Sequence, residues 1–398
     1  MGCSMSKIDR RGYIMIGIMF VGLLGDNATT VIVGSMAMKY GYIPLKYGIT
    51  DYGKLFGKDF TDVHDMVFSG WDYQDKSVFE CAMNKGIIST EIISLVPELN
   101  KIMPYKGIHT DMDIPLEDNF NHYYNPQTVT QAIQFIKKDI LDFKSKNHLN
   151  NVIVFYMGSP AKVIESNILK LSYDNIMQLE VKQLPSSLLY AIAAIESNAH
   201  FVDFTPSETL EFCFINDLAR KYGVQVSGRD GSTGQTMLKL VIADMLRIRN
   251  LHLDAWYSTN IIGNHDGYIL SMPEYCVTKI QDKTNGIKNL LGYDDFEHKV
   301  SIEYFKYKGD KKESWDAVYF SGWLNEPMSL KLNWQGEDSI LAAPIILDII
   351  RLIVLGSEYG LCGIQKQLGL FYKHPFLCEG MSFTQLYEQL INYYAGLS

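Results

Sequence analysis

Apolar runs that alternate with amphipathic segments divide the first half of the chain into predicted strands and helices. Residues 13–21 form a continuous apolar run of strand length, which is typical of a parallel strand buried on both faces. An amphipathic helix is predicted at 125–146 and an apolar strand at 151–157. A further helix at 188–197 precedes a strand at 200–204. Strands alternating with helices indicate an α/β fold with a doubly wound sheet.

A capping pattern follows the strand at 200–204. Thr205 could cap a helix whose first position is Pro206, and Glu208 would complete a capping box. The pattern predicts one helix that runs to Tyr222 and is closed by Gly223.

The pattern changes in the second half of the chain. A helix is predicted at 236–249, and three runs with strand alternation follow at 298–308, 315–323 and 328–334. Consecutive strands with short connections predict an antiparallel sheet. The long apolar segment 336–356 then predicts a helix buried against a sheet.

Composition narrows the class of protein. A length of 398 residues suggests two domains, and 47% hydrophobic with 20% charged residues is ordinary for a soluble globular protein. A net charge of −9 argues against a nucleic-acid partner. Six cysteines without a CxxC pair or metal-ligand spacing indicate a reducing, cytoplasmic compartment.

The amino terminus imitates a targeting signal. Basic residues precede the apolar run 13–21, but no small-residue cleavage site follows it, so we expect a buried strand and no stable membrane span. The opening MGCSMS matches the N-myristoylation pattern at Gly2 and Ser6, and the sequence leaves open whether Gly2 is lipidated.

The turn after the first strand is a candidate dinucleotide site. A strand, a glycine turn and a helix place backbone N–H groups opposite a pyrophosphate. The candidate residues are Gly22, Gly25, Asp26, Asn27, Ala28 and Thr29. Their spacing is not a clean GxGxxG, so taken alone the turn fits an ordinary βα loop equally well.

Two later turns are candidates for the same ligand. Asp72, after the next predicted strand, could accept hydrogen bonds from ribose hydroxyls, or it could cap a helix that starts near Gln74. Gly158 and Ser159 could line a nicotinamide pocket, or form a plain βα loop.

The stretch 258–283 carries the densest candidate chemistry. Asn260, Asn264, Asp266, Lys279 and Lys283 combine groups that hold hydroxyls with groups that neutralise oxyanions, which suits an anionic substrate. The alternative is a polar loop followed by a solvated helix.

Three motifs in this order resemble the myo-inositol-phosphate synthases: SGRDGSTGQT at 227–236, STNIIGNHDG at 258–267 and GEDSILAAPIILD at 336–348. Weaker similarity extends from near Tyr13 to near Lys373. The resemblance implies an NAD-binding Rossmann-like domain at 1–235 and 342–398, with an inserted α+β catalytic and tetramerisation domain at 236–341.

Such synthases convert D-glucose 6-phosphate to 1D-myo-inositol 3-phosphate by oxidation at C5, enolisation, aldol closure onto C1 and re-reduction. The resemblance therefore implies NAD as the cofactor, a sugar phosphate as the ligand and a homotetramer. It leaves open whether a divalent cation or ammonium assists.

The resemblance assigns catalysis to six charged residues: Lys279, Lys366, Lys306, Lys283, Asp230 and Asp338. Lys279 and Lys366 would neutralise oxyanions, while Lys306 and Lys283 would hold phosphate and enolate. The aspartates would orient the lysines. Lys306 could equally be a solvent-facing strand residue. The sugar hydroxyls or the nicotinamide end would be bound by Asn260, Asn264 and Asp266.

Ala28, Ser232 and Ile261 depart from the family pattern, which has glycine, lysine and histidine there. These departures keep two alternatives open. One is an NAD-dependent sugar-phosphate dehydrogenase, and the other is a catalytically silent binding or scaffold relative.

Overall fold

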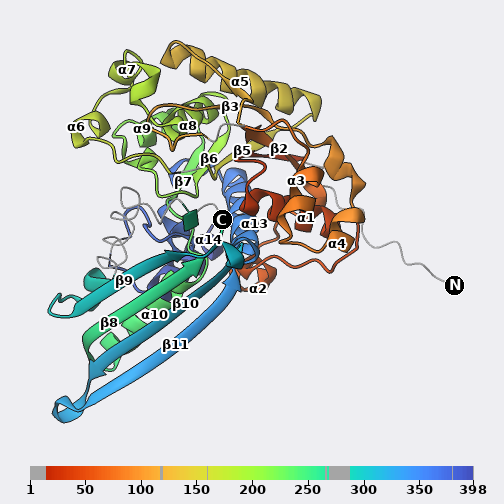
Figure 1. Cartoon of the computed structure of the whole chain (residues 1–398). Helices are drawn as coiled ribbons and strands as arrows, with labels where there is room; N and C mark the ends of the chain where they lie inside the picture. Colours follow the sequence, from red (N-terminus) through yellow and green to blue (C-terminus); the bar gives the residue numbers. More distant parts are fainter. Residues whose placement is uncertain are drawn as a thin grey trace.

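An eight-stranded parallel sheet forms one half of the molecule (Figure 1). The computed structural model describes residues 15–116, 120–158, 160–264, 267–268, 287–378 and 380–397. The strand order is β12-β7-β6-β5-β1-β2-β3-β4, and every adjacent pair runs parallel. These strands are β1 (Ile16–Val21), β2 (Met66–Asp72), β3 (Tyr105–Ile108), β4 (Tyr123–Tyr124), β5 (Asn151–Tyr156), β6 (His200–Asp203), β7 (Gln225–Ser227) and β12 (Gly363–Ile364).

Helices cover both faces of this sheet, which confirms the predicted doubly wound arrangement. Along β1, Ile18 and Phe20 pack into one core, and Met19 and Val21 into the other, which is why the strand is apolar throughout. The first core is covered by α1 (Asp26–Lys39), α3 (Val78–Lys85), α4 (Thr90–Ser94) and α13 (Asp338–Glu358). The second is covered by α5 (Val129–Lys146), α8 (Ser186–Glu196) and α9 (Ile215–Lys221).

Helix α13 is long and apolar enough to cross a membrane by length and composition alone. In the structure 72% of its most apolar window is buried, and the helix packs against α1. Its apolar character therefore reflects its place in the core of the protein.

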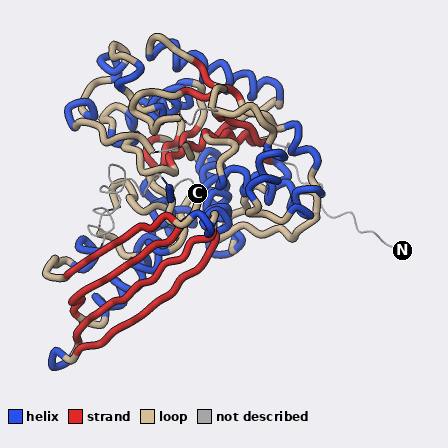
Figure 2. The backbone as a smooth tube through the Cα atoms, in the orientation of Figure 1, coloured by secondary structure: helices blue, strands red, loops and turns tan. Residues whose placement is uncertain are grey.

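A second, four-stranded sheet extends away from the first (Figure 2). Its order is β11-β10-β8-β9, with β8 (His252–Ile262), β9 (Glu297–Tyr304), β10 (Lys311–Ser321) and β11 (Pro327–Glu337). Helix α10 (Gln235–Ile248) covers one face, where Ile242 and Leu246 join a core with Trp256 and Val318.

The prediction of an antiparallel sheet in this region was partly wrong. Strand β10 is antiparallel to both β11 and β8, but β9 runs parallel to β8. Strand β8 was not predicted, and its end carries Asn260 of the 258–283 stretch. Residues 263–296 connect β8 to β9, and a connection of more than a dozen residues is long enough to bring two strands parallel. The domain boundaries at 235 and 342 stay a prediction.

The predicted helix from Thr205 to Tyr222 was also wrong. The Thr205 N–H and hydroxyl both donate to Oδ1 of Asp203, at 2.9 and 2.7 Å, and this local turn competes with helix formation. Helix α9 begins only at Ile215, and the chain turns after it at Gly223, whose φ of +66° favours glycine.

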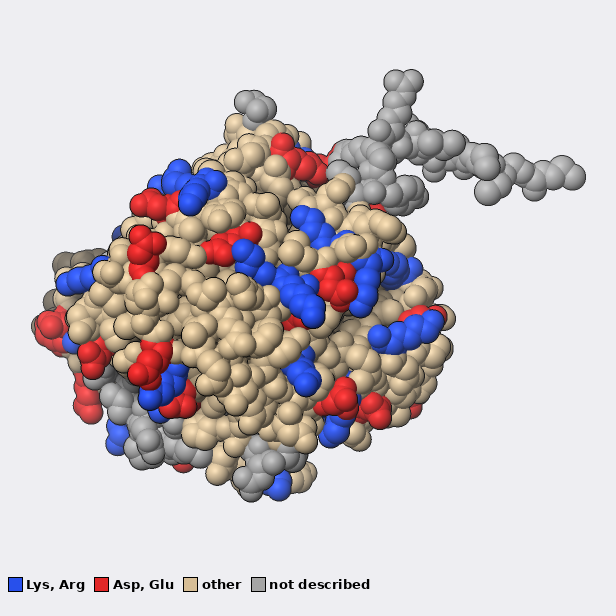
Figure 3. All heavy atoms as spheres, turned by 90° about the horizontal axis from the view of Figure 1, so that it is seen from above, with Lys and Arg blue, Asp and Glu red and all other residues tan. Residues whose placement is uncertain are grey.

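The remaining helical segments are short, apart from α14 near the carboxyl end. The α-helices are α2 (Gly53–Phe56), α6 (Ser166–Leu169), α7 (Tyr173–Ile176) and α14 (Phe383–Ala395). The 3-10 turns are η1 (Ile49–Asp51), η2 (Val63–Asp65), η3 (Pro97–Lys101), η4 (Val181–Gln183), η5 (Thr209–Glu211), η6 (Lys306–Lys308), η7 (Trp323–Asn325) and η8 (Lys366–Phe371). Acidic and basic side chains are interspersed over the surface seen in Figure 3.

Candidate active site

A cleft of about 480 Å³ lies at the carboxyl ends of β1, β2, β5 and β6, where doubly wound sheets usually bind their ligands. The β1–α1 turn, the loops that follow β2, β5, β6 and β7, and the start of α13 contribute to its walls. Asn264 and Asp310, which flank strands of the second sheet, also line the cleft. The cleft is therefore built from both sheet regions.

The turn between β1 and α1 directs the amino end of the helix towards the cleft. Gly22 has a φ of +84°, and its N–H donates to the carbonyl of Trp71 at 2.9 Å. Gly25 is the N-cap residue and has no side chain to bond the first-turn N–H groups. A Cβ atom on Gly25 would lie 3.0 Å from the Gly22 carbonyl oxygen. The turn is thus compact and leaves backbone donors for an anion.

Seven of the nine predicted cofactor residues line the cleft. Those that line the cleft are Gly22, Gly25, Asp26, Asn27, Ala28, Asp72 and Gly158. Ala28 is only 1% exposed, because its methyl group packs in the core beneath the turn. The buried Thr29 hydroxyl donates to the carbonyl of Gly25 at 2.8 Å and holds the turn. Ser159 lies outside the described residues.

Asp72 is bound to backbone donors at the end of β2. Its Oδ2 accepts the N–H of Leu24 at 2.8 Å, and its Oδ1 accepts the N–H of Tyr73 at 2.8 Å. Burial raises the pKa of this carboxyl group, although the backbone bonds oppose that shift. The following helix begins at Val78 and is capped by Ser77, so Asp72 does not cap it.

Asp230 forms a close pair with Lys373. The lysine Nζ lies 2.7 Å from Oδ1 of Asp230, and both residues line the cleft. Asp230 is buried and has a φ of +60°, a left-handed conformation that aspartate tolerates better than most residues. A backbone bridge between Gly231 and Tyr372 joins the two segments next to this pair.

A second lysine–aspartate pair lies at the start of α13. Nζ of Lys312 is 3.4 Å from Oδ2 of Asp338, and the Thr233 hydroxyl donates to Oδ1 at 3.0 Å. Burial disfavours the ionised carboxylate, but the charges of Lys312 and Lys373 outweigh it and hold the pKa of Asp338 below its usual value. Asp338 therefore stays ionised at neutral pH.

Asp310 and Asn264 form a third polar group in the cleft. The Asn264 amide donates to Oδ1 of Asp310 at 3.1 Å, and the N–H of Ser339 donates to Oδ2 at 3.2 Å. Burial raises the pKa of Asp310, and the negative charges of Asp26 and Asp338 raise it further. Asn264 is thus oriented within the cleft, and its role in substrate binding stays a prediction.

Asn260 lies on β8 and is buried. Neither atom of its amide has a hydrogen-bond partner among the described residues, and Asn260 is not among the residues that line the cleft. Lys306 lies in the η6 turn with an exposed side chain and does not line the cleft either. Asp266, Lys279 and Lys283 fall outside the described residues.

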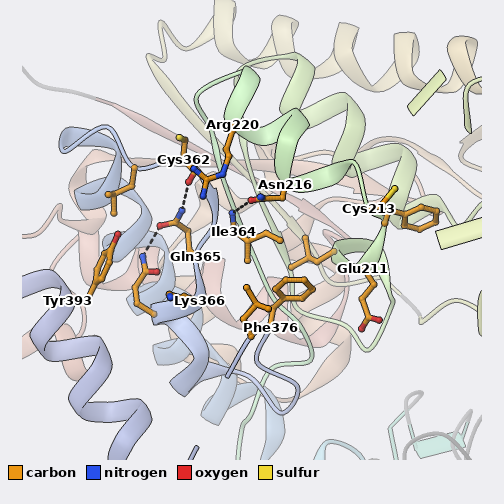
Figure 4. Close-up of a pocket in the computed structure, with 15 residues that line it drawn as sticks. Glu211, Cys213, Asn216, Arg220, Cys362, Ile364, Gln365, Lys366, Phe376 and Tyr393 are labelled. Carbon is orange, nitrogen blue, oxygen red and sulfur yellow. Dashed lines mark hydrogen bonds between the residues drawn. The ribbon is translucent and has the colours of Figure 1, made fainter. Parts of the chain in front are cut away.

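Lys366 lies in a different pocket (Figure 4). This pocket has a volume of about 470 Å³ and lies between α9, the β12 strand and the η8 turn. Arg220 and Phe376 also line it. The structure thus brings Asp230 and Asp338 together at the cleft, but it does not bring Lys366 there.

Comparison with known proteins assigns the chain to a family. Residues 58–392 match the family model described as myo-inositol-1-phosphate synthase, which is a model of NAD-binding proteins. The chain belongs to the myo-inositol-1-phosphate synthase family. This membership confirms the resemblance identified in the three sequence motifs.

Several synthases of this family are similar over most of their length. Inositol-3-phosphate synthase 1 of Bacteroides thetaiotaomicron is 32% identical, with 90% of this chain and 89% of the relative covered. A crystal structure of the Caenorhabditis elegans inositol-3-phosphate synthase has a TM-score of 0.85 at 22% identity, over 96% of this chain and 86% of that one. A myo-inositol-1-phosphate synthase-related protein from Thermotoga maritima has a TM-score of 0.74 at 20% identity, over 96% and 99%. The two structures show the same fold.

Four charged residues at the cleft were not predicted from the sequence. Lys85, Asp310 and Lys373 line the cleft, and Lys312 reaches it through Asp338. The similarity to the family extends to Lys373, so a signal for that residue was present. Among the described residues, no group of three or more His, Cys, Asp or Glu side chains is placed to hold a metal ion.

Proposed function

We propose that this chain is an inositol-3-phosphate synthase, which converts D-glucose 6-phosphate to 1D-myo-inositol 3-phosphate with NAD as a recycled cofactor. One observation carries the proposal. In a chain of this family, two lysine–aspartate pairs, Lys373 with Asp230 and Lys312 with Asp338, meet at a cleft bordered by the glycine turn of a dinucleotide site.

The residues at the turn fit NAD. The first-turn N–H groups of α1 would bind the pyrophosphate, and the glycines leave room for it. Asp72 would accept a hydrogen bond from a ribose hydroxyl, because its Oδ2 accepts only the N–H of Leu24 and retains a lone pair. When bound, NAD supplies the hydride acceptor for C5 of the sugar and later the hydride donor.

The proposed reaction develops negative charge on the sugar at two points, on the C5 oxygen during enolisation and on the C1 oxygen during ring closure. Lys373 can donate to such an oxyanion, since its ammonium group is held by Asp230 and needs little reorganisation. Loss of one such donor typically costs about 2.7–4 kcal/mol of transition-state stabilisation. Asp338, which stays ionised, would keep Lys312 charged and oriented nearby.

Polar residues on the opposite wall suit the sugar hydroxyls. Asn264 is held by Asp310, and its carbonyl oxygen also accepts the N–H of Gly267 at 3.0 Å. Asn260 is buried outside the cleft, so its unpartnered amide has no direct access to the sugar. By resemblance, Asp266, Lys279 and Lys283 would complete this side of the site.

One assay tests the proposal against its alternatives. The purified protein is incubated with glucose 6-phosphate and NAD, and both periodate-releasable phosphate and NADH are measured. We expect inositol phosphate to accumulate without net NADH. Net NADH release would support a sugar-phosphate dehydrogenase, and the absence of both products would support a catalytically silent relative.

We further propose that the second sheet mediates assembly into a homotetramer. Odd-numbered residues of β10 and their partners on β8 lie on the face away from α10, and three aromatic side chains on it, Tyr257, Trp315 and Tyr319, are 45, 52 and 44% exposed. A sheet face that presents several large apolar side chains is typical of a protein–protein contact.

A further inference from the structure

An acidic side chain lies where the proposed cofactor site should accept a phosphate. Asp26 is the first residue of α1 and lines the cleft. A carboxylate in the first turn stabilises a helix through the helix dipole. The same charge, however, repels an anionic ligand that approaches the N–H groups of that turn.

The negative charge of Asp26 extends across the cleft. Burial is the main cause that raises the pKa of Asp310 on the opposite wall, and the charge of Asp26 adds to that effect. Asp26 would therefore also act on a pyrophosphate bound at the first turn of α1, unless a cation compensates it.

Lys85 supplies that cation. Its Nζ is paired with Oδ1 of Asp26, and both residues line the cleft. The two side chains are 22 and 28% exposed, so water screens this pair less than it screens a fully exposed one.

Helix α3 holds Lys85 in place. A capping box between Ser77 and Glu80 starts the helix, and Lys85 is its last residue before Gly86, whose φ is +68°. One turn earlier, the thiol of Cys81 donates to the carbonyl of Leu24 at 3.2 Å. This hydrogen bond attaches helix α3 to the β1–α1 turn.

We infer that Lys85 is a positioning residue which neutralises Asp26 and so permits a pyrophosphate-bearing cofactor to bind at the amino end of α1. This inference rests on the proposed function, since it requires that the cleft binds NAD. Lys85 is then needed for cofactor binding only while Asp26 carries a negative charge.

A double-mutant cycle tests this dependence directly. Dissociation constants for NAD are measured by calorimetry for the wild type, Lys85→Ala, Asp26→Asn and the double variant, with melting temperatures recorded for each. Lys76→Ala, on an exposed residue just before α3 that does not line the cleft, serves as the matched control. Binding of ADP, which carries the pyrophosphate, is compared with binding of adenosine, which does not.

We expect Lys85→Ala to weaken NAD and ADP binding about tenfold or more, to leave adenosine unaffected, and to lose part of its effect at high salt. Asp26→Asn should bind NAD at least as tightly as the wild type, because Lys85 then lacks its acidic partner, and the double variant should bind NAD as the wild type does. A double variant as weak as Lys85→Ala would overturn the inference, because Lys85 would then bind the cofactor itself. Unchanged affinity in Lys85→Ala would also overturn it. A wild type that fails to bind NAD would instead reject the proposed function.

Discussion

Lys373 and Asp230 are joined twice, once through their side chains and once through their backbones. The Nζ–Oδ1 distance is 2.7 Å, and the backbone N–H of Lys373 donates to the carbonyl of Asp230, also at 2.7 Å. Two segments far apart in the sequence are therefore held together at the cleft. The ammonium group is pre-positioned, which is the property that oxyanion stabilisation requires.

This geometry predicts that Lys373→Ala lowers turnover of glucose 6-phosphate by roughly a hundredfold or more, as expected for the loss of one oxyanion donor. NAD affinity should change little, because the proposed pyrophosphate site is the first turn of α1 and Lys373 is assigned to the sugar. Steady-state kinetics and cofactor titration measure the two effects separately.

Lys366→Ala is the matched comparison, since this lysine lies seven positions earlier but lines the other pocket. We expect it to retain near-wild-type turnover, contrary to the catalytic role that the resemblance assigned to it. A strong loss in Lys366→Ala with normal activity in Lys373→Ala would reverse our assignment.

Gly25→Leu should abolish NAD binding. A Cβ atom there would already lie 3.0 Å from the Gly22 carbonyl oxygen, and a longer side chain would cover the first-turn N–H groups of α1. Gly34→Ala on the same helix is the control, because a Cβ atom at Gly34 meets no atom within 4 Å. That variant should bind NAD normally and gain up to about 1 kcal/mol of helix stability. Normal affinity in a folded Gly25→Leu variant would contradict the site.

Asp203 predicts a pH-dependent cost in stability. Burial raises the pKa of this carboxyl group to about 6, although the Thr205 hydroxyl and N–H oppose the shift, and its Oδ2 has no hydrogen-bond partner among the described residues. The folded state binds this proton more tightly than the unfolded state, whose aspartate pKa is about 3.9. As the pH rises from about 4 to 6, the contribution of Asp203 to the free energy of unfolding therefore decreases, and it stays low at higher pH.

Asp203→Asn removes this titration and should retain an acceptor for Thr205. The free energy of unfolding of the variant minus that of the wild type should be larger at pH 8 than at pH 4, by roughly 1–3 kcal/mol. Urea unfolding at both pH values measures this difference, with the exposed Asp217→Asn on α9 as a control. An equal effect at the two pH values would show that Asp203 does not titrate in this range.

Trp315→Glu should dissociate the proposed oligomer. A charge in the centre of the uncovered sheet face cannot be buried against another copy without a large desolvation cost. Light scattering at micromolar concentration measures the mass of the particle. Trp323→Glu changes a more exposed tryptophan in the η7 turn, at the tip of the hairpin, and should leave the mass unchanged. A wild type that is monomeric would remove the proposal altogether.

The local pattern of the sequence was sufficient for the doubly wound sheet. A strand buried on both faces must be apolar throughout, so β1 (Ile16–Val21) could be recognised without knowledge of its neighbours, and helix α5 was visible from its amphipathic period. The glycine turn was equally readable, because its backbone conformation depends on residues adjacent in the chain.

Tertiary structure alone decided which charged groups meet. Lys373 and Lys366 are both lysines near the carboxyl end, and only the path of the η8 turn places one at the cleft and the other in a separate pocket. Strand β8 and the pairing of Lys85 with Asp26 were likewise invisible in the sequence, since both depend on partners more than forty positions away. Long-range contacts of this kind leave no periodic signal in the sequence, because each partner is compatible locally with a solvated surface position.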